Sequence, residues 1–342
     1  MYRRRAGTGR SRPHGALPRR RRQQDDHGAG PHRGRRLGVS ANGSPVAAAR
    51  RAALLLDTKC MLGEGATWCA QTGRFYWTDI EGARLWRHDP SDGRSTFWRM
   101  HERLATFALC ADPHYLLLGL ATHLAFFDLA TGETRRIVDV EPGLNTRVND
   151  GRCDRQGRFV FGTKDEGTPL RPVGGFYRLN HDLSLERLPL PAPAISNSIA
   201  FSPDGATMYY CDSPMREIRV CDYRADGSVA NHRLFTRLTD ATGEPDGSTV
   251  DRDGGLWNAQ WGGGRVVRYG PDGVETERVD VPTAQPSCVA LGGPQLGTLY
   301  ITSARCALDA AALAGDKRAG GVFVATPGRR GLPEPVFQGA PA

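Results

Sequence analysis

The sequence is short of long apolar stretches and of helical periodicity. No run among its 342 residues approaches the roughly 18 consecutive apolar residues that suggest a membrane-spanning helix. Apolar residues rarely recur at the spacing of an amphipathic helix, and only the Ala-rich segment 308–314 predicts a short helical turn. We therefore expect no membrane partner and a fold built almost entirely from β-strands.

The eight cysteines lack the paired spacing of zinc fingers, and the N-terminal region lacks the apolar run of a secretory signal peptide. Many of the cysteines stand in apolar segments, where a free thiol packs as a small hydrophobic side chain. These features predict reduced cysteines in a cytoplasmic protein.

Acidic residues are almost missing from the first 51 positions, which carry fourteen Arg, no Lys and only Asp25 and Asp26. This segment has a net charge of +12, so the rest of the chain carries −4 of the total of +8. Because it also lacks apolar periodicity, we predict a disordered extension over 1–51, ahead of one folded domain over 52–342. A transit peptide and a wrongly assigned translation start are the alternatives; a start near Val46 would suffice. The mildly acidic domain is not expected to bind nucleic acid.

What the sequence does contain is one short pattern repeated six times. Each copy has a strand, a polar turn, a second strand, a gap and a third strand. The second strands are separated by 41, 43, 49, 48 and 43 residues, and they begin at Phe75, Leu116, Phe159, Met208, Leu256 and Leu299. Short strands with a period of roughly 40–50 residues are typical of β-propeller blades. The sequence therefore predicts an all-β, six-bladed β-propeller.

The segment Leu54–Leu56 precedes the first copy and has no hairpin of its own. We predict that it pairs with the last blade, near Pro335–Phe337. That pairing would close the ring by joining the two ends of the domain.

The repeat also predicts where a functional site lies. The first strand of each propeller blade lines the central channel, so the residues that enter these strands converge at one face. The positions 10 to 12 residues before each second strand are all polar: Glu64, Thr106, Asn149, Asn197, Asp246 and Ser287. Three of these, Glu64, Asn197 and Asp246, offer the oxygen ligands that Ca²⁺, Mg²⁺ and Mn²⁺ prefer. No His stands at these positions, which disfavours an imidazole-rich zinc site.

Simpler roles exist for several of these residues. Asp246 belongs to a Pro-Asp-Gly triplet that could be a turn, and Glu64 between two glycines could be a solvated loop acid. Asn149–Gly151 could form a type I′ turn. The equivalence of positions 64, 197 and 246 in the repeat favours a shared ligand role instead. Trp261, near the same face, could pack a blade or support a sugar ring.

Six segments resemble motifs of the SMP-30/gluconolactonase family, which includes regucalcin and bacterial sugar lactonases. They are Leu62–Gly65, Arg147–Gly151, Phe161–Thr163, Ile195–Asn197, Pro245–Gly247 and Gly262–Val266, and the resemblance covers about residues 54–330. It implies a six-bladed propeller, metal ligands at Glu64, Asn197 and Asp246, and substrate contacts at Arg147 and Asn149.

Two positions depart from the family pattern. A third substrate contact, a Glu in the family, aligns with Gly167, and Glu166 stands next to it. Lys164 occupies a position where members often have Met. These departures predict a sugar preference that differs from that of the animal enzymes.

The resemblance implies a carboxylic-ester hydrolase with one divalent metal ion, which could be Ca²⁺, Mn²⁺, Mg²⁺ or Zn²⁺. The expected reaction opens a sugar lactone, such as L-arabinono-, xylono- or gluconolactone, to the aldonic acid, with Asp246 as general base. A calcium-binding regulatory protein of the regucalcin type, a hydrolase of another small ester and an interaction scaffold are the alternatives. The sequence leaves the oligomeric state open.

Overall fold

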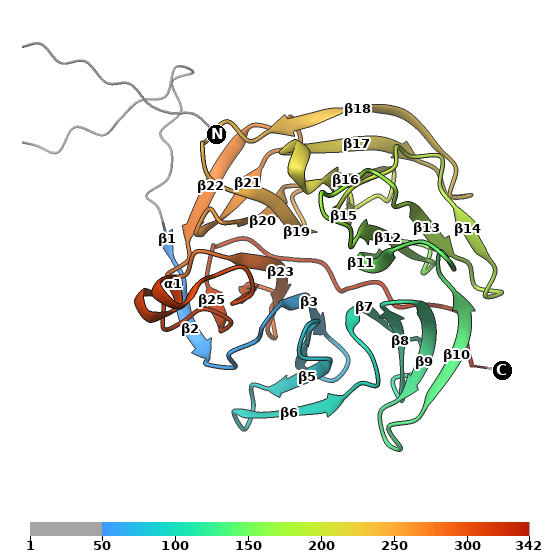
Figure 1. Ribbon diagram of the computed structural model, residues 1–342, viewed down its shortest axis with the longest axis horizontal. Coiled ribbons are helices and arrows are strands. Elements are labelled where there is room, and N and C mark those ends of the chain that lie inside the picture. The colour runs from blue at the N-terminus through green and yellow to red at the C-terminus, as the bar shows by residue number, and fades with distance from the viewer. Residues whose placement is uncertain (1–49, 342) are drawn as a thin grey trace, which may run out of the picture. The chain divides into compact units, whose positions relative to one another are not determined.

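Six sheets surround a central axis (Figure 1), and all their strand pairs are antiparallel except the pair of β1 and β22. The computed structural model describes residues 50–341. The inner strands of the six sheets are β3, β7, β11, β15, β19 and β23, and each contacts the inner strands of both neighbouring sheets. These contacts close a ring, so the predicted six-bladed β-propeller is confirmed.

The first three blades are continuous four-stranded meanders. Blade 1 contains β3 (Gly63–Cys69), β4 (Arg74–Asp79), β5 (Arg84–Asp89) and β6 (Arg94–Arg99). Blade 2 contains β7 (Leu104–Leu109), β8 (Tyr115–Leu120), β9 (His123–Asp128) and β10 (Thr134–Asp139). Blade 3 contains β11 (Thr146–Cys153), β12 (Phe159–Asp165), β13 (Phe176–Leu179) and β14 (Leu185–Arg187).

Blades 4 to 6 follow the same order, but the last two also recruit strands from the start of the described chain. Blade 4 contains β15 (Ser196–Phe201), β16 (Thr207–Asp212), β17 (Glu217–Tyr223) and β18 (Val229–Arg237), with the 3₁₀ helix η1 (Ser213–Met215) after β16. Blade 5 contains β19 (Glu244–Val250), β20 (Leu256–Trp261), β21 (Arg265–Tyr269), β22 (Glu275–Asp280) and β1 (Arg50–Arg51). Blade 6 contains β23 (Pro286–Gly292), β24 (Thr298–Ser303), β25 (Val322–Ala325) and β2 (Ala53–Leu56).

Segment 54–56 was correctly predicted to pair with the last blade, but the predicted partner strand was wrong. β2 is the outer strand of blade 6 and pairs with β25, where Ala53 faces Val324 and Leu54 faces Phe323. The expected partner, Pro335–Phe337, instead reaches the inner end of blade 2. There the Phe337 N–H donates to the Leu109 carbonyl (2.7 Å), and its fully buried ring joins the core. Burial of this aromatic ring accounts for the different course of the C-terminal segment.

The predicted extension over 1–51 is described only at its last two residues. Arg50 and Arg51 form β1, which runs parallel to β22 at the edge of blade 5. The remaining positions, 1–49, lie outside the described residues.

The core lies between neighbouring blades, so the central strands are buried on both faces. Between blades 6 and 1, aromatic rings stack in a row, with Phe75 4.5 Å from Tyr300 and 5.2 Å from Trp77 between ring centroids. Such rings bury large apolar areas in defined geometry. The roles of Trp68, Trp77 and Trp257 as blade-packing residues follow from this arrangement.

The one α-helix of the described residues, α1 (Ala310–Gly315), overlaps the helical turn expected over 308–314. Asp309 caps it by accepting a hydrogen bond from the Ala312 N–H (2.8 Å). Within residues 50–341, no helix has the length and apolar character required to cross a membrane. All eight cysteines fall within this range, and each is a free thiol.

Candidate metal and substrate site

Four of the six predicted axial residues line one cavity of about 260 Å³ at an end of the central channel. These four are Glu64, Asn149, Asn197 and Asp246, all of them buried. The other two do not line it. The Thr106 hydroxyl donates to the Gly151 carbonyl (3.1 Å), and the Ser287 hydroxyl donates to the Gly63 carbonyl. They join neighbouring blades instead.

A β-bulge interrupts each inner strand beside its axial residue. The register shifts between Glu64 and Thr67 in β3, between Val148 and Gly151 in β11, and at the matching points of the other four inner strands. A bulge redirects the side chains around it, and bulges are frequent next to active sites. The repeated bulge therefore explains why residues from separate blades meet at the axis.

The alternative assignments of these residues as surface turns do not fit the fold. Glu64 lies within β3 and is 9% exposed, so it is not a solvated loop acid. Asn149–Gly151 belongs to β11, and Asp246 belongs to β19. Trp261 does line the cavity, at the end of β20.

The cavity holds an excess of buried negative charge. Burial, reinforced by the charge of Asp150, raises the pKa of Glu64 to about 8. Burial and the charge of Glu64 raise the pKa of Asp246 well above its usual range. Neither carboxylate forms an ion pair with any residue of the described range 50–341. Two buried carboxylates without a cationic partner are costly, and a bound cation would remove that cost.

A hydrogen-bonded chain fixes the amides beside these acids. Arg147 Nη1 donates to Asn149 Oδ1 (2.7 Å), and Asn149 Nδ2 donates to Asn197 Oδ1 (3.0 Å). Asn197 Nδ2 then donates to the Ser213 hydroxyl (2.9 Å), which donates to the Pro245 carbonyl (2.7 Å). The chain orients Asn197 Oδ1, whose second lone pair remains available to a ligand.

Asp150 lies beside this chain without holding Arg147. Its two oxygens accept the N–H groups of Gly151 and Ile199, each at 2.8 Å. Asp150 thus ties blade 3 to blade 4, and its charge adds to the negative potential at Glu64 and Asp246.

Gly167, which aligns with the family's third substrate contact, and the adjacent Glu166 do not line the cavity. The Glu166 carboxylate accepts two hydrogen bonds from Arg103 (2.6 and 2.7 Å) and lies 3.8 Å from Arg147 Nε. The Gly167 N–H donates to Asp165 Oδ1 (3.0 Å). Neither is among the residues that line the cavity, whereas Lys164 is.

The cavity wall also includes residues to which the sequence assigned no role. Leu62, Ile195, Ser213, Glu244, Cys306 and Ala307 complete it. Leu62 and Ile195 each begin one of the family-like segments, two residues before an axial residue, so the repeat could have indicated them. Ser213 and Cys306 follow the second strands of their blades, and no motif marks them.

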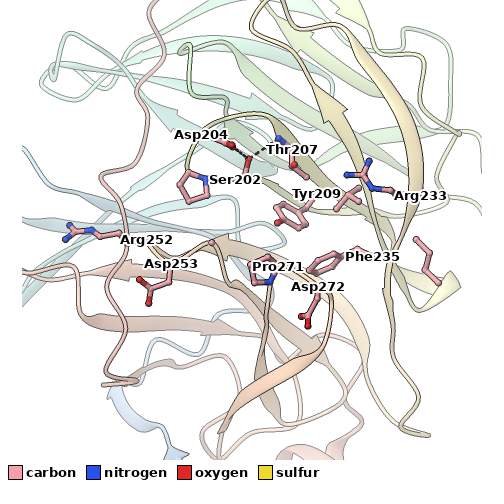
Figure 2. A pocket seen from close by; sticks show the side chains of 14 residues that line it. Ser202, Asp204, Thr207, Tyr209, Arg233, Phe235, Arg252, Asp253, Pro271 and Asp272 are labelled. Carbon is pink, nitrogen blue, oxygen red and sulfur yellow. Dashed lines mark hydrogen bonds between the residues drawn. The ribbon is translucent and has the colours of Figure 1, made fainter. Parts of the chain in front are cut away.

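A larger groove, of about 590 Å³, lies between blades 4 and 5 (Figure 2). Its walls include the turns at Ser202–Thr207 and Arg252–Gly254, which follow the opposite ends of the inner strands from Asn197 and Asp246. Asp204 there accepts the Ser202 hydroxyl (2.6 Å), as the dashed line in Figure 2 marks, and the Ala206 N–H (3.0 Å). This acid stabilises its own turn, so the chemistry of the axial cavity makes the better candidate site.

Comparison with known proteins agrees with the geometry. Residues 62–305 match the family model described as the SMP-30/gluconolactonase/LRE-like region. The chain belongs to this family. It is 66% identical over 294 residues to an L-arabinolactonase of Azospirillum brasilense, covering 86% of this chain and 97% of that protein.

Two further relatives extend the comparison. A pentonolactonase of Haloferax volcanii is 34% identical, with coverage of 78% of this chain and 89% of the relative. The crystal structure of a calcium-binding protein, regucalcin, from Agrobacterium tumefaciens matches with a TM-score of 0.81 at 30% identity. The match covers 85% of this chain and 99% of that structure. The expected family and fold are thereby confirmed.

Proposed function

We propose that this protein is a metal-dependent sugar lactonase that hydrolyses an aldonolactone to the aldonic acid. The observation that carries the proposal is the buried set of Glu64, Asn197 and Asp246 beside Arg147 and Asn149 in one cavity. The 66% identity to an L-arabinolactonase favours L-arabinonolactone as the first substrate to test.

Glu64, Asn197 and Asp246 would hold one divalent cation. Their carboxylate and amide oxygens suit a hard cation such as Ca²⁺, Mn²⁺ or Mg²⁺, and Zn²⁺ stays on the list to be tested. The two buried carboxylates lack an ion-pair partner in the described range, which agrees with a cation as their natural partner. When bound, the ion supplies Lewis-acid polarisation of the lactone carbonyl.

Asp246 is assigned as the general base. It would accept a proton as a water oxygen attacks the carbonyl carbon, and return it to the ring oxygen as the bond between that oxygen and the carbonyl carbon breaks. The product is the open hydroxy acid, which loses its own proton to solvent. Asp246 is buried in the cavity wall, so its carboxylate is held where a lactone and the attacking water would meet.

Arg147 and Asn149 are assigned to substrate orientation. Arg147 Nη1 is held by the Val148 carbonyl (2.8 Å) and by Asn149 Oδ1, so the guanidinium has little freedom. No hydrogen bond from Arg147 Nη2 to another residue of the range 50–341 is formed, which leaves donors for the oxygens of a bound lactone. Fixed donors orient a substrate at little entropic cost.

The test is a pH-indicator assay on a panel of aldonolactones, using chelated protein with each divalent metal added back. Asp246→Ala should lower turnover at least 100-fold, the scale at which removal of a general base is felt, while the fold survives. Asp272→Ala, in the groove between blades 4 and 5, is the matched control and should keep full activity. Near-wild-type turnover by Asp246→Ala would contradict the assignment.

A calcium-binding role without turnover is the second candidate, because the regucalcin structure of Agrobacterium tumefaciens is so similar. The same protein samples separate the two functions. Tight Ca²⁺ binding with no hydrolysis of any lactone would favour the regulatory role.

A further inference from the structure

Lys164 places an amine in the wall of the cavity without giving it a partner. It lies on β12 directly opposite Arg147 on β11, and residues paired in this way project from the same face of a sheet. Both side chains line the cavity. Among residues 50–341, none forms a hydrogen bond or an ion pair with the Lys164 ammonium.

The nearby acids are already engaged by another cation. Glu166 accepts both of its hydrogen bonds from Arg103, whose Nη1 also lies 3.6 Å from Glu81. Lys59, by contrast, is paired with Asp57 at 2.7 Å. Arg103 thus contacts both carboxylates, and their charges reach Lys164 without an ion pair.

The position of Lys164 leaves its ammonium donors open to a ligand. Lys164 is half-buried, and burial together with the charge of Arg147 lowers the pKa of its ammonium, against the opposing charges of Glu166 and Glu81. An ammonium group offers three donors and no acceptor, so an oxygen brought by a substrate can accept from it.

The fold indicates which part of the substrate would supply the acceptor for Lys164. Glu64, Asn149, Asn197 and Asp246 all belong to inner strands, whereas Lys164 belongs to the second strand of blade 3. Adjacent strands lie about 4.8 Å apart, so Lys164 stands roughly one sugar ring's width farther from the axis than Arg147. A lactone with its carbonyl at the axial oxygens would extend its hydroxyl groups toward Lys164.

We propose that Lys164 donates a hydrogen bond to a hydroxyl group of the lactone remote from the carbonyl, and thereby determines which sugar is preferred. The inference rests on the proposed lactonase function. It assigns to Lys164 the place in the cavity that Glu166 and Gly167 do not reach.

The test combines side-chain and substrate changes. Lys164→Met keeps similar length and removes every donor, and Lys317→Met, at an exposed position, is the matched control. Both are assayed with L-arabinonolactone and with deoxy analogues that each lack one hydroxyl group. Lys164→Met should lower kcat/KM roughly 10- to 100-fold, mainly through KM, because a hydrogen bond from a charged donor is lost. Lys317→Met should match the wild type.

The decisive result is non-additivity between the Lys164→Met substitution and the removal of one substrate hydroxyl group. Removal of the hydroxyl group that Lys164 contacts should reduce kcat/KM in the wild type but have little further effect in Lys164→Met. Additive losses for every hydroxyl group, or an unchanged kcat/KM in Lys164→Met, would overturn the inference while the lactonase function stands. No hydrolysis by the wild type with any metal would refute both. Should Lys164→Met fail to fold, Lys164→Leu gives the same cycle with another side chain that has no donor.

Discussion

We expect the stability of the metal-free protein to fall as the pH rises, and Glu64 contributes to this dependence. In the folded, metal-free protein the pKa of Glu64 is raised from 4.5 to about 8. Between these values the folded protein retains a proton on Glu64 that the unfolded chain has released. Folding therefore takes up a proton, and the free energy of unfolding decreases as the pH rises through this window.

The size of the change in unfolding free energy follows from the difference between the two pKa values of Glu64. Each pH unit between the two pKa values costs about 1.4 kcal/mol, so the penalty at pH 7 is about 3 kcal/mol and is nearly absent at pH 4.5. Glu64→Gln removes the titrating group and keeps the shape of the side chain. The metal-free variant should thus be more stable than the metal-free wild type by about 3 kcal/mol at pH 7, or roughly 5–10 °C in Tm.

The assay is a series of thermal and urea unfolding curves on chelated protein from pH 5 to pH 8. The difference between wild type and Glu64→Gln is the measured quantity, because it isolates the titration of Glu64 together with the part of the Asp246 shift that the Glu64 charge causes. Saturating Ca²⁺ or Mn²⁺ should stabilise the wild type and reverse the order of the two proteins. A difference that does not change with pH, or that grows as the pH falls, would refute the reasoning.

Two further predictions concern the scaffold. Phe337→Ala should destabilise the protein by about 3–5 kcal/mol, since the ring is fully buried. Truncation after residue 341 is the control. A loss of less than about 1 kcal/mol in urea unfolding would contradict the role of Phe337 in the core. Asp251→Asn should lower the free energy of unfolding by about 3–5 kcal/mol, since this buried carboxylate accepts hydrogen bonds from Arg268 Nε (2.7 Å) and Trp257 Nε1 (2.9 Å). The folded fraction should keep its lactonase activity. Unchanged stability in urea would refute the estimate.

The blades themselves could be predicted from the sequence because each is a contiguous antiparallel meander. Hairpin turns and strand alternation act over a few residues, so the six copies and their order need no long-range information. The axial set follows from the same repeat, since one offset within each blade leads to the same level of the channel. Glu64, Asn149, Asn197 and Asp246 were found in this way.

Features that depend on contacts between distant segments could be determined only from the tertiary structure. β2 closes the ring by pairing with β25, and the sequence could not rank this partner above Pro335–Phe337 because both segments are apolar. Glu166 turns toward Arg103, 63 residues earlier in blade 2, which withdraws it from the cavity and leaves Lys164 there. The repeat determines which residues arrive at the axis, because it is local. Which side chains then face the cavity also depends on hydrogen bonds between blades, such as those from Arg103 to Glu166, and these exist only once the blades have packed together.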